Sequence, residues 1–478
     1  MTPILAIARL ALRNALRSRV LLTLFALLFA SSFLLPLAIR SDGTPEGLIR
    51  LHLTYTLGIA SFLLGLATLW GGAAAISREA VDKTLQLVLV KPVPRHHIWL
   101  GKWIALLLIN ACLLALVGAA TALTLREKLR GARFDPAALD LARHTTLNAL
   151  DTLRSPLPDI EDTVRAELDT LRSQNRLPPG MPDDVVLDNL RRHHLARLYS
   201  IPPGESRSWT FDRPAGAPSL AASPFVQFRC DASVPGATRI EATLHLETGP
   251  LSLDRTSAVI PGTLHTVLFD DLPAGASFPL TLTFTNHGTH DAALFFDPAD
   301  GLILRLPRGA FAANYLRALA QLYLRLALFA AIGVTLGTLF SMPVATFLTL
   351  VLLLILQLGG FVSAAAQVDR ATFVDRVAPF GADAHSHGHD GDSPAPPPPS
   401  FAARAAATFL FYAYRATWLT LRPLLENQTL DRLSTGTRIP PRVLLHDLLR
   451  QGLFLPAALA LLSTLVLKKR EWALPSLP

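Results

Sequence analysis

The chain has 478 residues, of which 51% are hydrophobic and 17% charged, and its formal net charge is +8 at pH 7. The apolar residues gather in long blocks, which excludes a chain that is soluble throughout. The positive charge lies largely beside these blocks, and no basic face with interleaved aromatic residues accompanies it. We therefore predict no nucleic-acid partner.

Six apolar runs are long enough to cross a bilayer, because about 20 residues at 1.5 Å rise per residue span its hydrocarbon core. The first run follows basic residues, as the core of a signal peptide does. It is longer than such a core, and no small-residue cleavage site clearly follows it, so we expect a retained membrane helix. The six runs are Val20–Ile39, Tyr55–Ile76, Lys102–Leu125, Leu316–Phe340, Val344–Gln367 and Leu448–Leu467.

Three basic clusters set the orientation, since Lys and Arg beside short loops stay in the cytoplasm. They precede the first run, separate the second from the third, and follow the sixth in Lys468–Arg470. Six spans put all three clusters on one side. We expect a multi-pass protein of the inner (cytoplasmic) membrane with both termini in the cytoplasm.

The first 19 residues predict an amphipathic helix. Arg9, Arg13 and Arg17 recur every four residues and form one basic stripe beside an apolar flank. Such a helix lies in the membrane interface and leads into the first span. Two roles remain open: anchoring to anionic lipids, or contact with a cytoplasmic partner.

The segment between the third and fourth spans is large enough for an extracytoplasmic domain. Its first part is predicted to be helical, because Asp135-Pro136 resembles a helix start and Leu147 and Leu150 follow at near-helical spacing. From Ser206 onward, short alternating runs separated by Pro, Gly, Asn and Asp predict seven or eight antiparallel strands. Their number favours a β-sandwich.

The predicted fold is an α-helical polytopic membrane protein with six transmembrane helices and an inserted extracytoplasmic domain of helices and a β-sandwich. Gly333 and Gly337, in the fourth span, have the spacing of a close helix contact or dimer face. The predicted organisation is an interfacial helix (1–19), spans one to three (20–125) with a cytoplasmic elbow (77–101), a helical region (126–205), a β-sandwich (206–310), spans four and five (311–367), a His/Pro-rich linker with an interfacial helix (368–445), and span six with a basic tail (446–478).

The common catalytic motifs are missing from the sequence, including the P-loop, the G-x-S-x-G elbow and the H-E-x-x-H helix. We therefore predict a chain that is not an enzyme and that binds no cofactor itself. His385, His387 and His389 could converge on zinc or copper, but a solvated His-rich linker is the interpretation we favour, so no metal site is predicted.

The sequence ISREAVDKTLQLVLVKPVPRHHIWLGK joins the second and third spans. Glu79 and Lys83 are spaced to pair on a helix that continues the second span. Pro92 and Pro94 then force a break, and a new helix can begin at Arg95. The segment predicts a rigid elbow through which a partner moves both spans; a plain cytoplasmic loop is the alternative.

This elbow resembles that of the ABC-2 family of ATP-binding-cassette transporter permeases. The resemblance continues in the basic N-terminal helix, in the tight Ser341-Met342-Pro343 link and in the C-terminal KKRE, and it covers roughly residues 1–125 and 311–478. Lys83 stands where the family usually has Gly. The residues that match the family's pattern in the elbow are Glu79, Thr84, Pro92, Arg95, Gly101 and Lys102.

The resemblance implies a half-transporter that pairs with a second permease copy or paralogue and with two cytoplasmic ATPase subunits, which hold ATP and magnesium. The N-terminal helix and the elbow would receive the movement of the ATPase, and we expect an exporter. One alternative is mechanotransmission, in which the extracytoplasmic domain acts on a periplasmic or envelope partner and nothing crosses the membrane. Another is a metal-handling permease that uses the His-rich linker.

Overall fold

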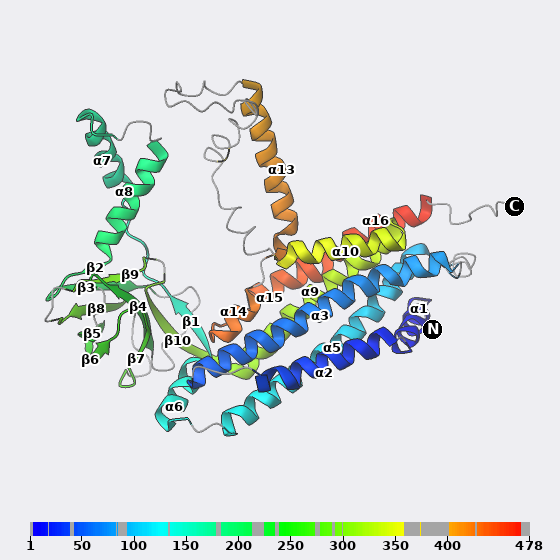
Figure 1. Ribbon diagram of the computed structural model, residues 1–478, viewed down its shortest axis with the longest axis horizontal. Helices are drawn as coiled ribbons and strands as arrows, with labels where there is room; N and C mark the ends of the chain where they lie inside the picture. Colours follow the sequence, from blue (N-terminus) through cyan, green and yellow to red (C-terminus); the bar gives the residue numbers. More distant parts are fainter. Residues whose placement is uncertain are drawn as a thin grey trace, which may run out of the picture. The chain divides into compact units, whose positions relative to one another are not determined.

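The computed structural model describes residues 3–17, 19–38, 43–82, 84, 93–131, 134–177, 183–212, 224–234, 239–272, 278–288, 292–298, 300–357, 373, 401–425 and 428–469. The chain forms two compact units. The helical unit comprises Met1–Leu139, Tyr315–Thr435 and Ile439–Pro478, and the β-rich unit comprises Asp140–Asn314 and Gly436–Arg438. Figure 1 shows the helices and strands of both units.

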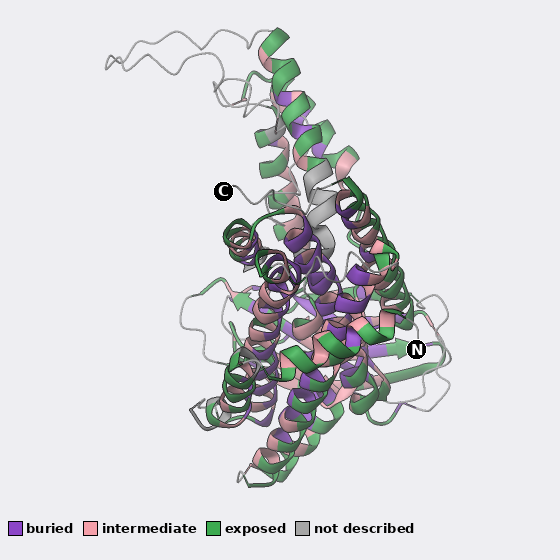
Figure 2. Cartoon of the chain, turned by 90° about the vertical axis from the view of Figure 1, so that its right-hand side faces the viewer, coloured by how far each residue is buried: buried purple, intermediate pink, exposed green. Residues whose placement is uncertain are grey.

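In the helical unit, long helices pack side by side, with α3 and α5 in contact and α1 and α16 packed on α5. Figure 2 shows buried residues gathered along the sides where helices meet. The helices of the described segments are α1 (Pro3–Leu16), α2 (Arg19–Ala38), α3 (Pro45–Val81), α5 (Arg95–Gly131), α9 (Phe311–Leu339), α10 (Met342–Gln357), α13 (Phe401–Leu425), α14 (Thr429–Ser434), α15 (Pro441–Asp447), the π-helix η2 (Leu448–Phe454) and α16 (Leu455–Lys469).

Four helical stretches among the described residues are long and apolar enough to cross a membrane: Pro45–Val81, Arg95–Gly131, Phe311–Leu339 and Pro441–Lys469. Two shorter apolar stretches, Leu22–Leu34 and Met342–Ile355, overlap the first and fifth predicted spans. The predicted fifth span continues beyond Gln357 into residues outside the described ones. The chain is therefore a helical polytopic protein with several candidate spans.

Helices α3 and α5 are longer than the apolar runs from which they were predicted. Thr44 caps α3, since its hydroxyl accepts a hydrogen bond from the Gly47 amide at 3.0 Å and Pro45 occupies the first turn. The helix continues past the apolar run to Val81, and α5 resumes at Arg95, next to Pro94. The predicted helical extension and restart on either side of the elbow are therefore confirmed.

The β-rich unit contains two antiparallel sheets. One has the order β1-β10-β4-β9-β2, with β7 also paired to β4, and the other has the order β3-β8-β5-β6. The strands are β1 (Asn148–Leu153), β2 (Ser200–Ile201), β3 (Ser206–Phe211), β4 (Phe225–Ala232), β5 (Ile240–Thr248), β6 (Leu251–Val259), β7 (Leu264–Leu268), β8 (Leu280–Asn286), β9 (Leu294–Phe296) and β10 (Leu302–Ala310).

Both sheets contribute to one apolar core. Strand β5 alternates buried and outward residues along its length, as expected for a strand with one face on a core. Phe284 of β8 is fully buried against Phe228 of β4 and Phe296 of β9, with ring centroids 5.4 and 5.1 Å away. Aromatic rings from both sheets therefore fill the space between them.

The helical region expected at 126–205 is only partly helical. It contains α6 (Pro136–Thr145), α7 (Glu161–Ser173) and α8 (Asp183–Leu198), but Asn148–Leu153 forms β1. Strand β1 pairs along its length with β10, which supplies backbone partners that a short isolated helix would lack. The helical expectation for Leu147–Leu150 is therefore wrong.

A short segment from between α14 and α15 joins this unit. Leu150 of β1 donates its amide hydrogen to the Gly436 carbonyl at 2.9 Å, and the Arg438 amide donates to the Leu150 carbonyl at 2.8 Å. The bridge between Leu150 and Thr437 is parallel. Gly436 has a φ of +69°, and an added Cβ would lie 2.9 Å from the Thr145 carbonyl oxygen, so this close approach favours glycine.

Candidate functional site

Helix α1 packs along α5 with its apolar side. Ala8 is buried in this contact, and Ile4 and Ile7 are half-buried. At Gly101 the approach is close, because an added Cβ would lie 2.8 Å from Ile7 Cβ and 3.1 Å from the Ile4 carbonyl oxygen. Gly101, a residue of the predicted site, therefore lets the two helices meet.

The basic stripe of α1 faces away from this contact. Arg9, Arg13 and Arg17 are all exposed, and so are the apolar side chains of Leu5 and Leu16. Exposed leucines beside exposed arginines suit a helix that lies at a membrane surface. The same stripe leaves three cations accessible to a partner with negative charge.

Glu79 and Lys102 form an ion pair between the last turn of α3 and the first turns of α5. The Lys102 Nζ lies 2.7 Å from Glu79 Oε2 and donates a second hydrogen bond to the Ala75 carbonyl at 2.5 Å. The Lys102 side chain is 4% exposed and that of Glu79 is 30% exposed. A buried ammonium requires such partners, so the pair fixes α3 to α5 at this point.

This pair differs from the one predicted by sequence spacing. Glu79 was expected to contact Lys83, which lies outside the described residues, and a lysine at the end of a membrane span commonly extends toward the interface. Lys102 turns inward instead, because α3 presents both a carboxylate and a carbonyl oxygen to it. Helix packing, which sequence spacing does not reveal, supplied the partner.

Two other predicted elbow residues, Thr84 and Arg95, bond to different helices. The Thr84 hydroxyl donates to the Glu79 carbonyl at 3.3 Å and stays near the end of α3. Arg95 reaches a different helix, since its guanidinium donates to the Leu467 carbonyl near the end of α16. A cation beside the last carbonyls of a helix is favourable. Pro92 lies outside the described residues.

Two tryptophans that sequence reasoning missed connect α5 to α9. Trp99 Nε1 donates to the Thr335 hydroxyl at 3.3 Å, and Trp103 Nε1 donates to the Ala327 carbonyl at 2.9 Å. Their rings are stacked, with centroids 5.6 Å apart. Their spacing in the sequence was a usable signal, because two tryptophans four residues apart in a helix share one face. The start of α5 is thus held to α3, α9 and α16.

The glycine pair of α9 contacts α3 of the same chain. A Cβ added to Gly333 would lie 2.5 Å from the Leu69 carbonyl oxygen, and one added to Gly337 would lie 2.3 Å from that of Ala73. Gly72 of α3 would meet the Val334 backbone nitrogen at 2.9 Å. The spacing that predicted a helix contact is therefore used for intramolecular packing in this structure.

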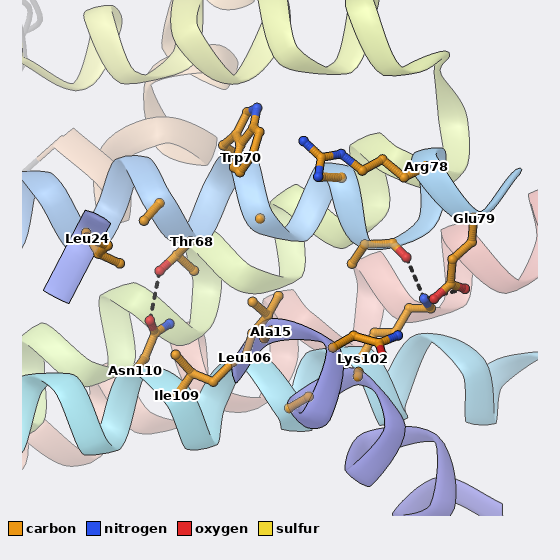
Figure 3. A pocket seen from close by; sticks show the side chains of 17 residues that line it. Ala15, Leu24, Thr68, Trp70, Arg78, Glu79, Lys102, Leu106, Ile109 and Asn110 are labelled. Atoms are coloured by element: carbon orange, nitrogen blue, oxygen red, sulfur yellow. Dashed lines mark hydrogen bonds and ion pairs between the residues drawn. The ribbon is translucent and has the colours of Figure 1, made fainter. Parts of the chain in front are cut away.

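A cavity of about 280 Å³ lies among α1, α2, α3 and α5. Figure 3 shows Thr68 and Asn110 in contact at one end and Glu79 and Lys102 in contact at the other. The wall between them is largely apolar and includes alanine and leucine side chains from all four helices: Ala11, Ala15, Leu24, Ala67, Ala74, Ala75, Ala105 and Leu106.

Metal binding has no support among the described residues, where no group of three or more His, Cys, Asp or Glu side chains could hold an ion. His385, His387 and His389 lie outside them, so that hypothesis stays a prediction. Cys112 and Cys230 are both free. Burial raises the pKa of the Cys230 thiol to about 12, which keeps it protonated and unreactive.

Long apolar helices that meet through backbone contacts, together with a β-rich extra domain, define the class of this chain as a polytopic membrane protein. The model of the family described as ABC-2 family transporter protein matches residues 5–134, which contain nearly all of α1 and the whole of α2, α3 and α5. The predicted resemblance to ABC-2 permeases is therefore confirmed over this part of the chain. Neither a curated protein nor a solved structure matches the chain.

Proposed function

We propose that the chain is the permease subunit of an ABC exporter, which a separate cytoplasmic ATPase drives through residues 77–101. The observation that carries this proposal is the contact between the two ends of that segment, where Glu79 of α3 and the buried Lys102 of α5 form an ion pair at 2.7 Å. Both residues lie within the stretch that matches the ABC-2 family.

The contacts give the proposed coupling a physical route. A force on the elbow acts on α3 and α5 together, because Glu79 and Lys102 join them. Trp99 passes the displacement to α9, and Arg95 passes it to α16. Close-packed helices shift as units and do not deform locally, so a small movement at the elbow reaches the whole bundle.

The remaining parts of the proposal follow from the sequence and the family. The partner subunit binds ATP and magnesium, since this chain has no P-loop. Six spans in the inner membrane place α1 and the elbow in the cytoplasm and the β-sandwich outside it. A second permease copy or paralogue completes the pathway. In support of this orientation, α1, the end of α3, the start of α5 and the end of α16 lie at one end of the helical unit (Figure 1).

Co-purification of the tagged full-length chain with its ATPase, followed by ATPase assays in lipid, tests the coupling. We expect Glu79→Gln and Arg95→Gln to leave the complex assembled and to lower its ATP turnover several-fold. Arg126→Gln, a matched loss of charge at the other end of α5, should leave turnover unchanged. If the complex forms and its turnover responds to neither elbow substitution, the coupling assignment is wrong.

The second candidate function is mechanotransmission, and the segment Gly436–Arg438 favours it. This segment pairs with β1 in the β-rich unit, while the chain on both sides of it belongs to the helical unit. Strand β10 also runs directly into α9, with Ala310 and Phe311 adjacent in the chain. Movement of the helices therefore has covalent routes into the β-rich unit.

Hydrogen exchange of the ATPase complex separates the two functions. Transmission predicts that ATP changes the exchange of the amides of Leu150 and Arg438, whereas the amides of β5 and β6, which belong to the other sheet, serve as the internal control. If the exchange of the Leu150 and Arg438 amides does not change during ATP turnover, transmission through this segment is ruled out.

A further inference from the structure

The cavity among α1, α2, α3 and α5 contains a buried donor without a partner. Asn110 is 3% exposed and lines the cavity, and its Nδ2 has no hydrogen-bond partner among the described residues. Few buried polar groups in proteins remain unpaired, because each costs about 1–3 kcal/mol. A donor kept in such a place indicates a bound molecule that completes its hydrogen bonding.

The amide orientation of Asn110 does not remove this free donor. The Thr68 hydroxyl has one hydrogen and lies 2.6 Å from the Leu64 carbonyl and 3.0 Å from Asn110 Oδ1. If the hydroxyl donates to Leu64, a turned amide could give one N–H to Thr68 and would still keep the other. At least one N–H of Asn110 therefore stays available in either orientation.

The opposite end of the cavity carries an excess of positive charge. Lys102 and Arg78 line it together with a single carboxylate, that of Glu79. Arg78 is exposed, its guanidinium lies 4.8 Å from the centroid of the Trp70 ring, and no carboxylate in the described part of the chain pairs with it. Two cations and one anion leave one positive charge, which favours an anionic group at this end.

The separation of the two ends and the volume limit the occupant. Asn110 is eight residues after Lys102 on α5, so the ends are about 12 Å apart at 1.5 Å per residue. The volume of about 280 Å³ is close to the lower end of the range for small-molecule sites, which is ~300–1,000 Å³. An apolar wall with a few polar groups at fixed positions is typical of such sites.

We propose that this cavity binds a single-chain anionic amphipath whose hydroxyl or carbonyl oxygen, about 12 Å from its anionic group, accepts a hydrogen bond from Asn110. The anion lies near Lys102 and Arg78, and the apolar body lies against the alanine and leucine wall. Since the site is formed within this chain, binding does not depend on the proposed ATPase coupling.

Photolabelling of the full-length protein in neutral detergent tests the site. The probe is decanoate with a diazirine in its chain, and the competitors are 10-hydroxydecanoate, decanoate and 1,10-decanediol. We expect labelling of α3 and α5 between Ala67 and Asn110, and about tenfold stronger competition by 10-hydroxydecanoate than by decanoate. The diol, which lacks the anion, should compete more weakly than 10-hydroxydecanoate. Equal competition by all three would overturn the proposal.

Substitutions assign the binding to this cavity. Gly71→Leu places a side chain in the cavity without a backbone clash, because its Cβ would lie 3.9 Å from Leu106 Cδ2, and it should abolish labelling. Gly58→Leu is the matched control on the same helix, with its Cβ 3.7 Å from Leu430 Cδ1, and should label normally. Labelling that survives Gly71→Leu would place the probe elsewhere and overturn the proposal.

Two further variants test the ends separately. Asn110→Ala should remove the tenfold preference for the hydroxylated competitor while labelling by the decanoate probe persists. Arg78→Gln should reduce the advantage of 10-hydroxydecanoate over the diol, and Arg126→Gln should not. A preference unchanged by Asn110→Ala would contradict the assigned hydrogen bond. All these labelling and competition experiments are made without the ATPase. Failure of the binding proposal is therefore distinguishable from failure of the coupling proposal.

Discussion

The two units of the molecule build their cores in different ways. In the helical unit a close contact lies between backbones, where Gly333 of α9 meets Gly72 of α3 and no side chain intervenes. In the β-rich unit large rings such as Phe284 fill the space between two sheets. Removing water from apolar surface stabilises the second kind of core, whereas close van der Waals contact stabilises helices surrounded by lipid. We therefore expect the β-rich unit to be destabilised most by removing atoms from its core and the helical unit to be destabilised most by adding atoms at its helix contacts.

The largest effect is expected from removing a ring in the β-rich unit. Phe284→Ala leaves a cavity beside Phe228 and Phe296 and should cost about 3–5 kcal/mol of unfolding free energy in that unit. The measurement is hydrogen exchange of the β5 and β8 amides in the full-length chain. Thr281→Ala, on the other face of the same strand, should cost less than about 1 kcal/mol. Equal costs would show that the rings do not form the core described here.

Adding atoms in the helical unit should come next. Gly333→Leu places a Cβ 2.5 Å from the Leu69 carbonyl oxygen, and since backbone cannot move aside cheaply, α3 and α9 must separate. We expect a loss of about 1–3 kcal/mol, the usual range for an overpacked core. Thermal unfolding in detergent measures it, and Gly58→Leu, which meets only a leucine methyl at 3.7 Å, should unfold like the parent chain.

A buried charge pair between α3 and α5 and an exposed charge pair within α5 should differ by a smaller free energy. The coupling free energy of Glu79 and Lys102, from a double-mutant cycle with Glu79→Gln and Lys102→Met, should be about 1–3 kcal/mol because the lysine is buried. Glu127 and Arg130 lie 3.5 Å apart on α5 with both side chains about 60% exposed, so their cycle should give less than about 0.5 kcal/mol. Similar values for the two pairs would mean that Lys102 is solvated.

The smallest effect concerns pH. On the outward face of β5, hydrogen bonds from Asp254 and Glu247 hold the pKa of His245 above its usual value of 6.5, with Asp254 the larger cause. Because the folded-state pKa is raised, this stabilisation is complete below about pH 6.5 and is lost as pH rises through the folded-state pKa.

Unfolding of the full-length chain between pH 5 and 9 measures this effect. The parent chain should be more stable than His245→Gln at the acidic end, and the difference should vanish at the alkaline end. Asp254→Asn should remove most of the same pH dependence. A difference that instead grows toward alkaline pH would contradict the sign derived from the raised pKa.

Much of the helical unit was predictable because apolar length and proline have direct local consequences. The run Tyr55–Ile76 predicted α3, and Pro92 and Pro94 predicted the break before Arg95, since a bilayer fixes helix length and proline ends a helix. Strands such as β5 were predictable from alternation. Gly333 and Gly337 were predictable as a contact, although their partner helix was not.

The candidate site was less predictable, since its contacts join residues that are distant in sequence. Glu79 pairs with Lys102, which is 23 positions away, and the indole of Trp99 pairs with Thr335, 236 positions away. Strand β1 was missed because its helix-like spacing is outweighed by pairing with β10, a choice that depends on long-range hydrogen bonds.

The sequence by itself determined the class of this protein: apolar blocks near 20 residues, basic clusters at their ends and an elbow like that of the ABC-2 permeases are all local patterns, and local patterns follow from hydration and backbone sterics. Only the tertiary structure decided which groups meet. It placed Lys102 against Glu79, left an N–H of Asn110 unpaired in a cavity, and added Gly436–Arg438 to a strand nearly 300 residues earlier. Such contacts arise from the packing of whole helices and sheets, where burial makes each polar group require a partner.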